Sequence, residues 1–136
     1  PNVTQLYFKG KIEQDGLNMK PGLGNPVSKK IYDIIDQSEI KDLGAELKKN
    51  NIKLDNDMVL YEVGQALIQE NKNEKALVLY KYYTQTFPNI VVAWNDMGDI
   101  YVNLGNKSEA IRCYKQALKI RPQNPRAKEA LEKLSK

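Results

Sequence analysis

The sequence predicts an all-α protein built from stacked pairs of helices, and two observations support this fold class. The first is an internal repeat, because residues 57–90 align with residues 91–124 without a gap, at an offset of 34 positions. The second is that apolar residues within each repeat recur at the i, i+3, i+4, i+7 spacing of an amphipathic helix. Repeats of this length are typical of helical solenoids, in which each unit buries its apolar face against its neighbours.

The two repeats keep their chemical character position by position. Small residues align with small ones, aromatic with aromatic and proline with proline. The aligned pairs are Leu60 with Trp94, Val63 with Met97, Gly64 with Gly98, Leu67 with Tyr101, Ala76 with Ala110, Leu77 with Ile111, Tyr80 with Tyr114, and Pro88 with Pro122. Each repeat is therefore expected to hold two helices with a polar break between them and a proline at its end, with Tyr80, Tyr101 and Tyr114 in the core.

Two glycines stand inside predicted helices at equivalent places in the repeats. Glycine in a helix costs about 1 kcal/mol relative to alanine, so a repeated glycine needs a reason. We expect Gly64 and Gly98 to mark close contact between the helices of a pair, with Ala76 and Ala110 as the small residues opposite. Gly105 is expected at a helix C-terminus.

The second repeat resembles the tetratricopeptide repeat, a helix–turn–helix unit of the same length. The residues that match the family pattern are Trp94, Met97, Gly98, Tyr101, Ala110, Tyr114, Ala117 and Pro122. The first repeat departs from it, with Leu67 in place of tyrosine and Tyr83 where the family prefers a small residue. The resemblance covers about half of the chain and implies a tetratricopeptide helical solenoid over residues 53–136.

The segments on either side of the repeats are expected to complete this solenoid. Residues 125–136 form a capping helix, with Asn124 as N-cap and Pro125 at the first helical position. Residues 27–52 form an N-terminal helical extension, since two repeats alone are marginal. One of its helices begins near Ser28.

The second helix of the extension is expected to run from near Ser38 to Asn50-Asn51. It carries apolar and small residues at the spacing of a first helix of a repeat, namely Ile40, Leu43, Gly44 and Leu47. We therefore expect it to stack as a degenerate first helix.

Residues 1–26 have a different character. Val3–Phe8 is β-prone and favours a short strand or hairpin, and a Gly/Pro-rich linker follows it to residue 26. Because one strand cannot stand alone in water, this segment docks on the helices, pairs with a second copy in self-association, or completes a sheet of another domain. Since the chain begins with Pro1 rather than Met, we expect it to be the C-terminal part of a larger protein.

The composition argues against several classes of function. The chain has no histidine and a single cysteine, Cys113, so the usual acid–base and nucleophilic sites are missing and we expect no catalytic residue, no metal and no cofactor. The basic excess lies in residues 119–136, which hold no aromatic residue, so nucleic acid is a poor partner. No run of about 18 apolar residues predicts a membrane span. The pairs Asp33/Asp36 and Asp96/Asp99 are expected on solvated faces.

The face that lines the concave groove in the tetratricopeptide family is the candidate binding site. The residues expected there are Met58, Tyr61, Gln65, Ile68, Val92, Asn95, Asp99 and Val102. A mixed apolar and amide strip suits a peptide or helix from a partner protein. The alternative is that the protein's own N-terminal segment fills the groove. Relatives that bind chaperone tails use lysine to hold a carboxylate, whereas this strip has none and Asp99 would repel one.

The sequence thus predicts a non-catalytic protein-interaction module that binds a peptide or partner protein through this face. An alternative comes from the order of the parts, which loosely resembles the tail of bacterial multidomain serine hydrolases. In that case the chain is the C-terminal accessory domain of a hydrolase, β-lactamase-like or esterase, whose catalytic domain is absent from this chain.

Overall fold

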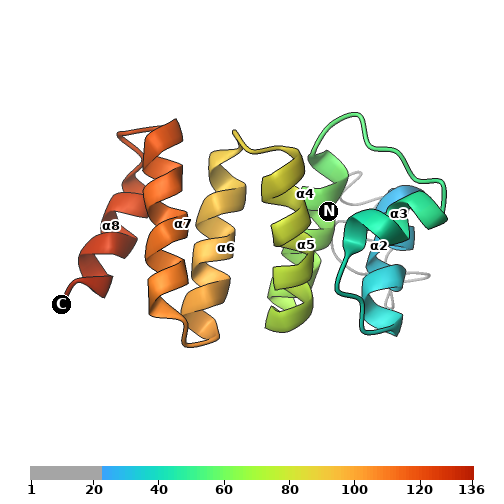
Figure 1. The fold of residues 1–136 in the computed structure, drawn as a ribbon, viewed down its shortest axis with the longest axis horizontal. Coiled ribbons are helices and arrows are strands. Elements are labelled where there is room, and N and C mark those ends of the chain that lie inside the picture. Colours follow the sequence, from blue (N-terminus) through green and yellow to red (C-terminus); the bar gives the residue numbers. More distant parts are fainter. Residues whose placement is uncertain (1–22) are drawn as a thin grey trace, which may run out of the picture.

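The computed structural model describes residues 23–136, and in that range the chain forms seven α-helices and no strand. The helices are α2 (Pro26–Gln37), α3 (Leu43–Lys49), α4 (Met58–Gln69), α5 (Asn73–Thr86), α6 (Val91–Asn103), α7 (Lys107–Ile120) and α8 (Pro125–Leu134). They stand side by side in a row, with α2 and α3 at one end and α8 at the other (Figure 1). The predicted helical solenoid is confirmed. The predicted strand Val3–Phe8 lies outside the described residues.

Each repeat is one pair of antiparallel helices, α4 with α5 and α6 with α7. The pairs join because α5 packs on α6, and α8 closes the row by packing on α7. Tyr80, Tyr101 and Tyr114 are all buried, as their repeat positions predicted. Trp94 is half-buried, and its indole N–H donates to the Pro88 carbonyl at 2.8 Å, which ties α6 to the end of the preceding repeat.

The two helical glycines lie where helices meet closely, as expected, but the opposing residue differs from the prediction. A Cβ built on Gly98 would lie 2.7 Å from the ring of Tyr114, and one built on Gly64 would lie 2.6 Å from the ring of Tyr80. The nearest opposing atoms therefore belong to tyrosine side chains rather than to the methyl groups of Ala76 and Ala110.

Tyr83 is accommodated at a place where the family prefers a small residue. Its ring is fully buried and stacks on Tyr80, with centroids 5.5 Å apart. Its hydroxyl donates to the carboxylate of Asp57, which precedes α4. Burial, followed by this hydrogen bond, raises the pKa of Tyr83 far above its ordinary value. Tyr83 thus takes, in the first repeat, the buried position that the smaller Ala117 takes in the second repeat.

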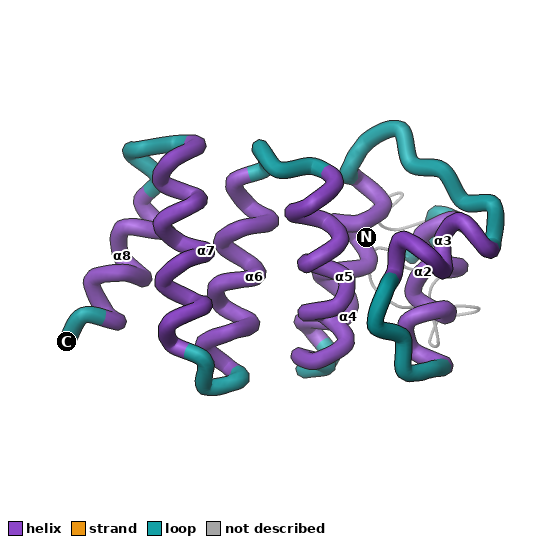
Figure 2. The backbone as a smooth tube through the Cα atoms, in the orientation of Figure 1, coloured by secondary structure: helices purple, strands orange, loops and turns teal. Residues whose placement is uncertain are grey.

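Helices α3, α4 and α6 each pass into a turn or loop (Figure 2), and the three endings share a left-handed residue. Asn51, Asn71 and Gly105 follow α3, α4 and α6 with φ of 56°, 57° and 80°. In each case the next N–H returns to a carbonyl five residues earlier, for example from Asn106 to Tyr101 at 2.9 Å. This is the Schellman ending, and Gly105 takes the C-terminal place that the sequence predicted.

The N-terminal extension holds two helices, and both begin at other residues than those predicted. Asn25 caps α2 by accepting from the N–H of Val27 at 2.7 Å, so α2 begins before Ser28. Asp42 caps α3, so that helix begins at Leu43 and leaves Ile40 in the connection.

The two helices of the extension pack on different helices of the first repeat. Helix α2 packs on α4, whereas α3 packs on α5. Helix α2 thus packs on α4 as α5 packs on α6, and stacking of residues 38–50 as a degenerate first helix stays a prediction. The buried residues of α2 follow the i, i+3, i+4, i+7 spacing without a glycine, and they are Ser28, Ile31, Tyr32 and Ile35.

A polar cluster fastens α2 to the turn between α4 and α5. Lys72 contacts Asp36 at 2.7 Å and the Tyr32 hydroxyl at 2.9 Å, and Lys75 donates to the backbone carbonyl of Asp36 at 2.8 Å. The hydrogen bond from Lys72 holds the pKa of Asp36 below its ordinary value against the opposing effect of burial. Asp36 is thus an ion-pair partner, which corrects the expectation that it lies on a solvated face.

Helix α8 has the form expected of a cap. Asn124 accepts from the N–H of Ala127 at 2.9 Å and Pro125 occupies the first turn. Ala127 is fully buried, while Ala130, Leu131 and Leu134 are partly buried against the core. The rest of α8 is polar, which suits the last helix of a solenoid.

Candidate functional site

A groove lies between α4, α6 and α8 and has a volume of about 470 Å³. Its lining residues are Ile68 from α4, Asp99, Val102 and Asn103 from α6, Tyr114 from α7, and Arg126, Glu129, Ala130, Lys133 and Leu134 from α8. Three of the eight predicted site residues, Ile68, Asp99 and Val102, line this groove. Half of its lining comes from α8, which the sequence interpretation treated only as a cap.

The other predicted residues divide into exposed and covered ones. Met58 and Tyr61 are 64% and 41% exposed on α4, beyond the groove. Val92 is half-buried near the start of α6. Gln65 and Asn95 are engaged in hydrogen bonds with other helices, so they shape the site from beneath.

Asp96 is the centre of a polar network below the groove. Its carboxylate accepts from the Tyr80 hydroxyl at 2.8 Å, from Gln65 Nε2 at 2.9 Å and from Arg126 at 2.7 Å. Because only 4% of Asp96 is exposed, the expectation of a solvated face is wrong for this residue. A buried carboxylate needs such donors, and here they come from α4, α5 and α8.

Arg126 extends the network to the groove surface. The same guanidinium nitrogen that contacts Asp96 donates to Asp99 at 2.6 Å, and the Tyr114 hydroxyl donates to the other oxygen of Asp99. Arg126 therefore offsets the negative charge that the sequence placed in the groove. The sequence interpretation missed this residue because it lies on α8, 27 residues from Asp99.

Asn95 holds α8 in place. Its side chain is 2% exposed, and Nδ2 donates at 3.0 Å to the same Asn124 oxygen that caps α8. Its Oδ1 is buried with no hydrogen-bond donor among the described residues. Asn95 thus positions one wall of the groove, and its amide does not face the surface.

Two tyrosines and the cysteine of the repeats are held in their protonated states. Burial, together with the hydrogen bonds to Asp96 and Asp99, raises the pKa of Tyr80 and Tyr114, so both hydroxyls remain protonated donors. Cys113 is fully buried, and that burial raises the pKa of its thiol to about 11. These groups suit a rigid binding surface, since none of them is a poised acid, base or nucleophile.

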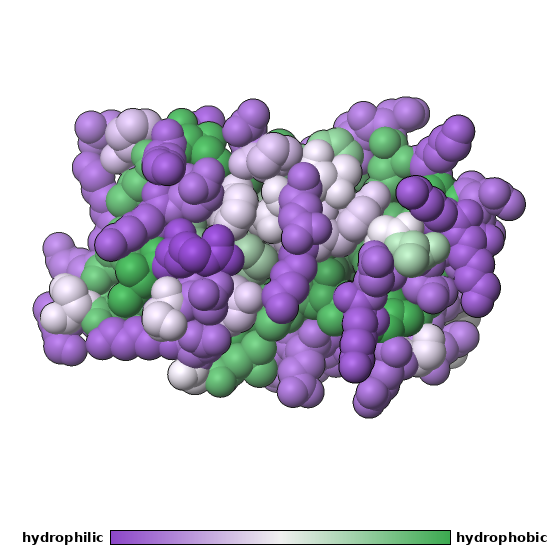
Figure 3. All heavy atoms as spheres, in the orientation of Figure 1, coloured by the Kyte–Doolittle hydropathy of each residue, from purple (hydrophilic) through white to green (hydrophobic). Residues whose placement is uncertain are grey.

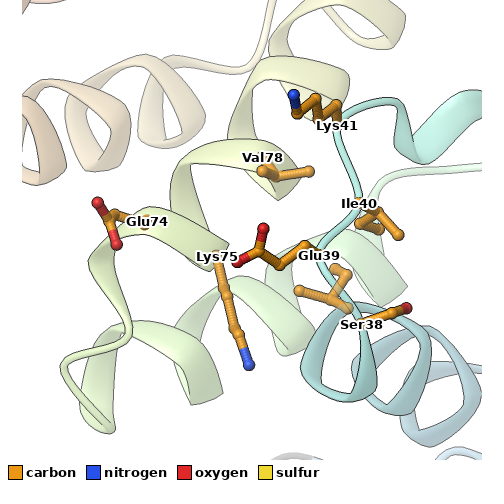
Figure 4. A pocket seen from close by; sticks show the side chains of 8 residues that line it. Ser38, Glu39, Ile40, Lys41, Glu74, Lys75 and Val78 are labelled. Atoms are coloured by element: carbon orange, nitrogen blue, oxygen red, sulfur yellow. The ribbon is translucent and has the colours of Figure 1, made fainter.

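A second hollow lies on another part of the molecule and holds none of the predicted residues. It has a volume of about 320 Å³ and lies between α5 and the connection that follows α2 (Figure 4). Ile35, Ile40 and Val78 form its apolar part, and charged residues of both signs surround them. Within residues 23–136, the structure has no cluster of three metal-ligating side chains and no helix long and apolar enough to cross a membrane.

Comparison with known proteins agrees with this architecture. The family described as "Tetratricopeptide repeat" matches residues 91–124, which are α6, α7 and their flanking turns. One similar protein is the "Ancillary SecYEG translocon subunit" of Buchnera aphidicola subsp. Acyrthosiphon pisum (strain APS), which is 32% identical over 78 residues. The match covers 57% of this chain and 38% of that relative, so the chain spans well under half of the relative's length. Neither finding supports a likeness to the tail of a serine hydrolase.

Proposed function

Because this chain is a tetratricopeptide-repeat protein, we propose that it binds a segment of a partner protein in the groove between α4, α6 and α8. Repeats of this family imply a protein-interaction module, and the ancillary role in the relative's name points the same way, to a non-catalytic task. That the ligand is a peptide or helix, and that it binds in this groove, is proposed from the residues that line the groove.

The observation that carries the proposal is an apolar floor beside polar groups that already have partners. Val102 is 42% exposed, and Ile68 and Leu134 lie beside it in the groove. Arg126 is paired with Asp96 and Asp99, and Lys133 lies 3.5 Å from Glu129. A ligand therefore gains most by placing apolar side chains on this floor, with the polar rim fixing its orientation.

Two further exposed apolar residues lie on α4, next to the groove-lining part of that helix. Met58 and Tyr61 precede Ile68 by about two to three turns, and both remain largely open to solvent. An extended segment or a helix of several turns that starts at Val102 can reach them along the first helices of the repeats. The proposed ligand is accordingly a segment with several apolar side chains rather than a single terminal carboxylate.

The test starts from peptides selected on the full chain from a displayed random library. Their dissociation constants are then measured by fluorescence anisotropy for the parent and for Val102→Asp. We expect binding to weaken at least about tenfold, because a carboxylate on the apolar floor loses the burial of roughly one side chain. Leu104→Asp is the matched control, since Leu104 is similarly exposed at 38% and lies outside the groove. Equal affinities of the Val102→Asp variant and the parent would exclude the groove.

The same peptides test whether the protein's own N-terminal segment competes for the groove. A chain shortened to residues 23–136 keeps Leu23 and the Asn25 cap, and circular dichroism verifies that it folds. If residues 1–22 occupy the groove, the shortened chain binds the peptides more tightly than the full chain. Unchanged affinity would indicate that the groove is open to a partner protein. Loss of a dimer on shortening would instead indicate self-association through Val3–Phe8.

A further inference from the structure

The charge of the described residues is divided unevenly along the solenoid. Residues 107–136, which include α7 and α8, carry nine lysines and arginines and three acidic residues, a net charge of +6. Residues 23–106 carry nine basic and twelve acidic residues, a net charge of −3. The basic excess of the protein therefore belongs to one end of the row of helices, the end closed by α8 (Figure 1).

Most of this charge is exposed along α7, just after it and at the start of α8. We use the name basic surface for six exposed residues, which are Lys107, Arg112, Lys115, Lys119, Arg121 and Lys128. The buried face of α7 consists of Ala110, Cys113, Tyr114 and Ala117, so helical spacing puts Arg112, Lys115 and Lys119 on the opposite side. That side faces away from the core, and hydrophilic and hydrophobic side chains lie next to one another at this end of the molecule in Figure 3.

Acidic partners do not neutralise the basic surface. Among the described ion pairs only Arg112 is engaged, with Glu109 at 2.9 Å, and Lys128 donates to the neutral Gln123. The acidic residues near the groove are already committed elsewhere, since Asp96 and Asp99 both pair with Arg126. The positive potential of the basic surface is thus directed to solvent.

The basic surface has charge but lacks the anchors that a protein or nucleic-acid partner needs. Tyr114 is the one aromatic residue in 107–136 and is 1% exposed, so no ring is free to stack on a base. The most exposed large apolar residues of the described chain all lie before Lys107, so none of them belongs to the basic surface. Charge without shape or apolar insertion is what a layer of anionic headgroups requires.

We propose that the basic surface on α7 and the start of α8 docks the protein on a membrane that contains anionic phospholipid. This goes beyond the proposed groove function, because it uses the outer side of α7 and none of the apolar floor. The protein would lie on the membrane surface by charge alone, with the groove between α4, α6 and α8 left for its partner. Binding of this kind is reversible and weakens with salt.

The experiment is co-sedimentation of the full chain with phosphatidylcholine vesicles, with and without phosphatidylglycerol. We expect binding only when phosphatidylglycerol is present. We also expect binding to be lost between about 0.15 M and 1 M salt, as the Debye length falls from about 8 to about 3 Å. Each basic side chain at an anionic leaflet contributes roughly a fivefold gain in partitioning, so Lys115→Glu/Lys119→Glu is expected to weaken binding about 30-fold or more.

The control is Lys48→Glu/Lys49→Glu, which makes the same change in net charge at two exposed lysines on α3. It should weaken vesicle binding far less than the pair on α7, and circular dichroism verifies that both variants fold. Equal losses in the two variants, or binding to pure phosphatidylcholine, would contradict the proposal. Binding to single-stranded RNA or to an acidic protein without binding to vesicles would replace the membrane with that partner. Val102→Asp should leave vesicle binding unchanged, so failure here is distinguishable from failure of the groove.

Discussion

The backbone of Gly98 in α6 lies against the ring of Tyr114 in α7, so that a Cβ on Gly98 would be 2.7 Å from two ring carbons. The same relationship joins Gly64 to Tyr80 one repeat earlier. Both rings are buried, and their hydroxyls donate to carboxylates of α6. Glycine and tyrosine therefore form one packing unit in each repeat, and neither ring can move aside without breaking its hydrogen bond.

Gly98→Ala is accordingly expected to destabilise the protein. Overpacking costs about 1–3 kcal/mol, and the better helix propensity of alanine returns about 1 kcal/mol of it. Urea denaturation followed by circular dichroism measures the difference. Gly24→Ala is the control, because a Cβ there meets no atom within 4 Å. A Gly98→Ala variant with an increased urea midpoint would show that the ring of Tyr114 is not fixed.

The two carboxylates of the Arg126 network are expected to differ in their contribution to stability. Asp96→Ala leaves the Tyr80 hydroxyl and Gln65 without their acceptor in a buried place and should cost about 1–3 kcal/mol. Asp99→Ala removes a carboxylate whose side chain is 50% exposed. The Tyr114 hydroxyl that loses its acceptor lines the groove, where water can replace the carboxylate, so the cost should be about 1 kcal/mol or less. Urea melts of both variants under the same conditions test this order. A larger loss of unfolding free energy in Asp99→Ala than in Asp96→Ala would contradict the prediction that Asp96 is the more important acceptor.

Cys113 is expected to be unreactive while the protein is folded. The side chain is fully buried, and burial raises its pKa to about 11, so little thiolate is present at neutral pH. An Ellman assay should show slow modification in buffer and stoichiometric modification in urea. The exposed Ser108 provides a positive control, because Ser108→Cys in a Cys113→Ser background should react at once. Fast modification of native Cys113 would mean that α7 opens readily.

The ion pairs of Asp36 should make stability depend on acid. Lys72 holds the folded-state pKa of Asp36 below the ordinary value of 3.8, so near and below that pH the unfolded state binds more protons. This contribution is present above the unfolded-state pKa and is lost as pH falls through the folded-state value. Urea midpoints of the parent and Asp36→Asn should therefore converge as pH is lowered from about 7 to about 3. Asp33→Asn is the control, and a constant difference between parent and Asp36→Asn would contradict the prediction.

The repeat architecture could be predicted because its signals are local and repeated. Gly64 with Gly98 and Tyr80 with Tyr114 recur at the same offset, so each confirms the register of the other. The end of α6 at Gly105 and the start of α8 at Asn124 follow from backbone preferences of single residues.

The predictions failed where the local sequence allows more than one helix start, or where burial depends on residues far away in the sequence. Ile40 fits the apolar spacing of a helix, yet Asp42 supplies a cap two residues later and α3 begins there. The local sequence around Asp96 is that of an exposed acidic residue. The donors that allow its burial, Gln65, Tyr80 and Arg126, come from three other helices. Burial of a charged residue depends on such distant partners, and no local pattern records them.

The hydrogen bonds of Asp96 also bear on how this array comes apart. A linear solenoid usually frays from its last helix, since that helix has one neighbour. Detaching α8 here would also remove Arg126 from a buried carboxylate and Asn124 from the amide of Asn95. Peeling the terminus therefore disrupts the interior of α6, and the two should open as one cooperative unit. Amide protons of α8 in native-state hydrogen exchange should then report the same opening free energy as those of α6.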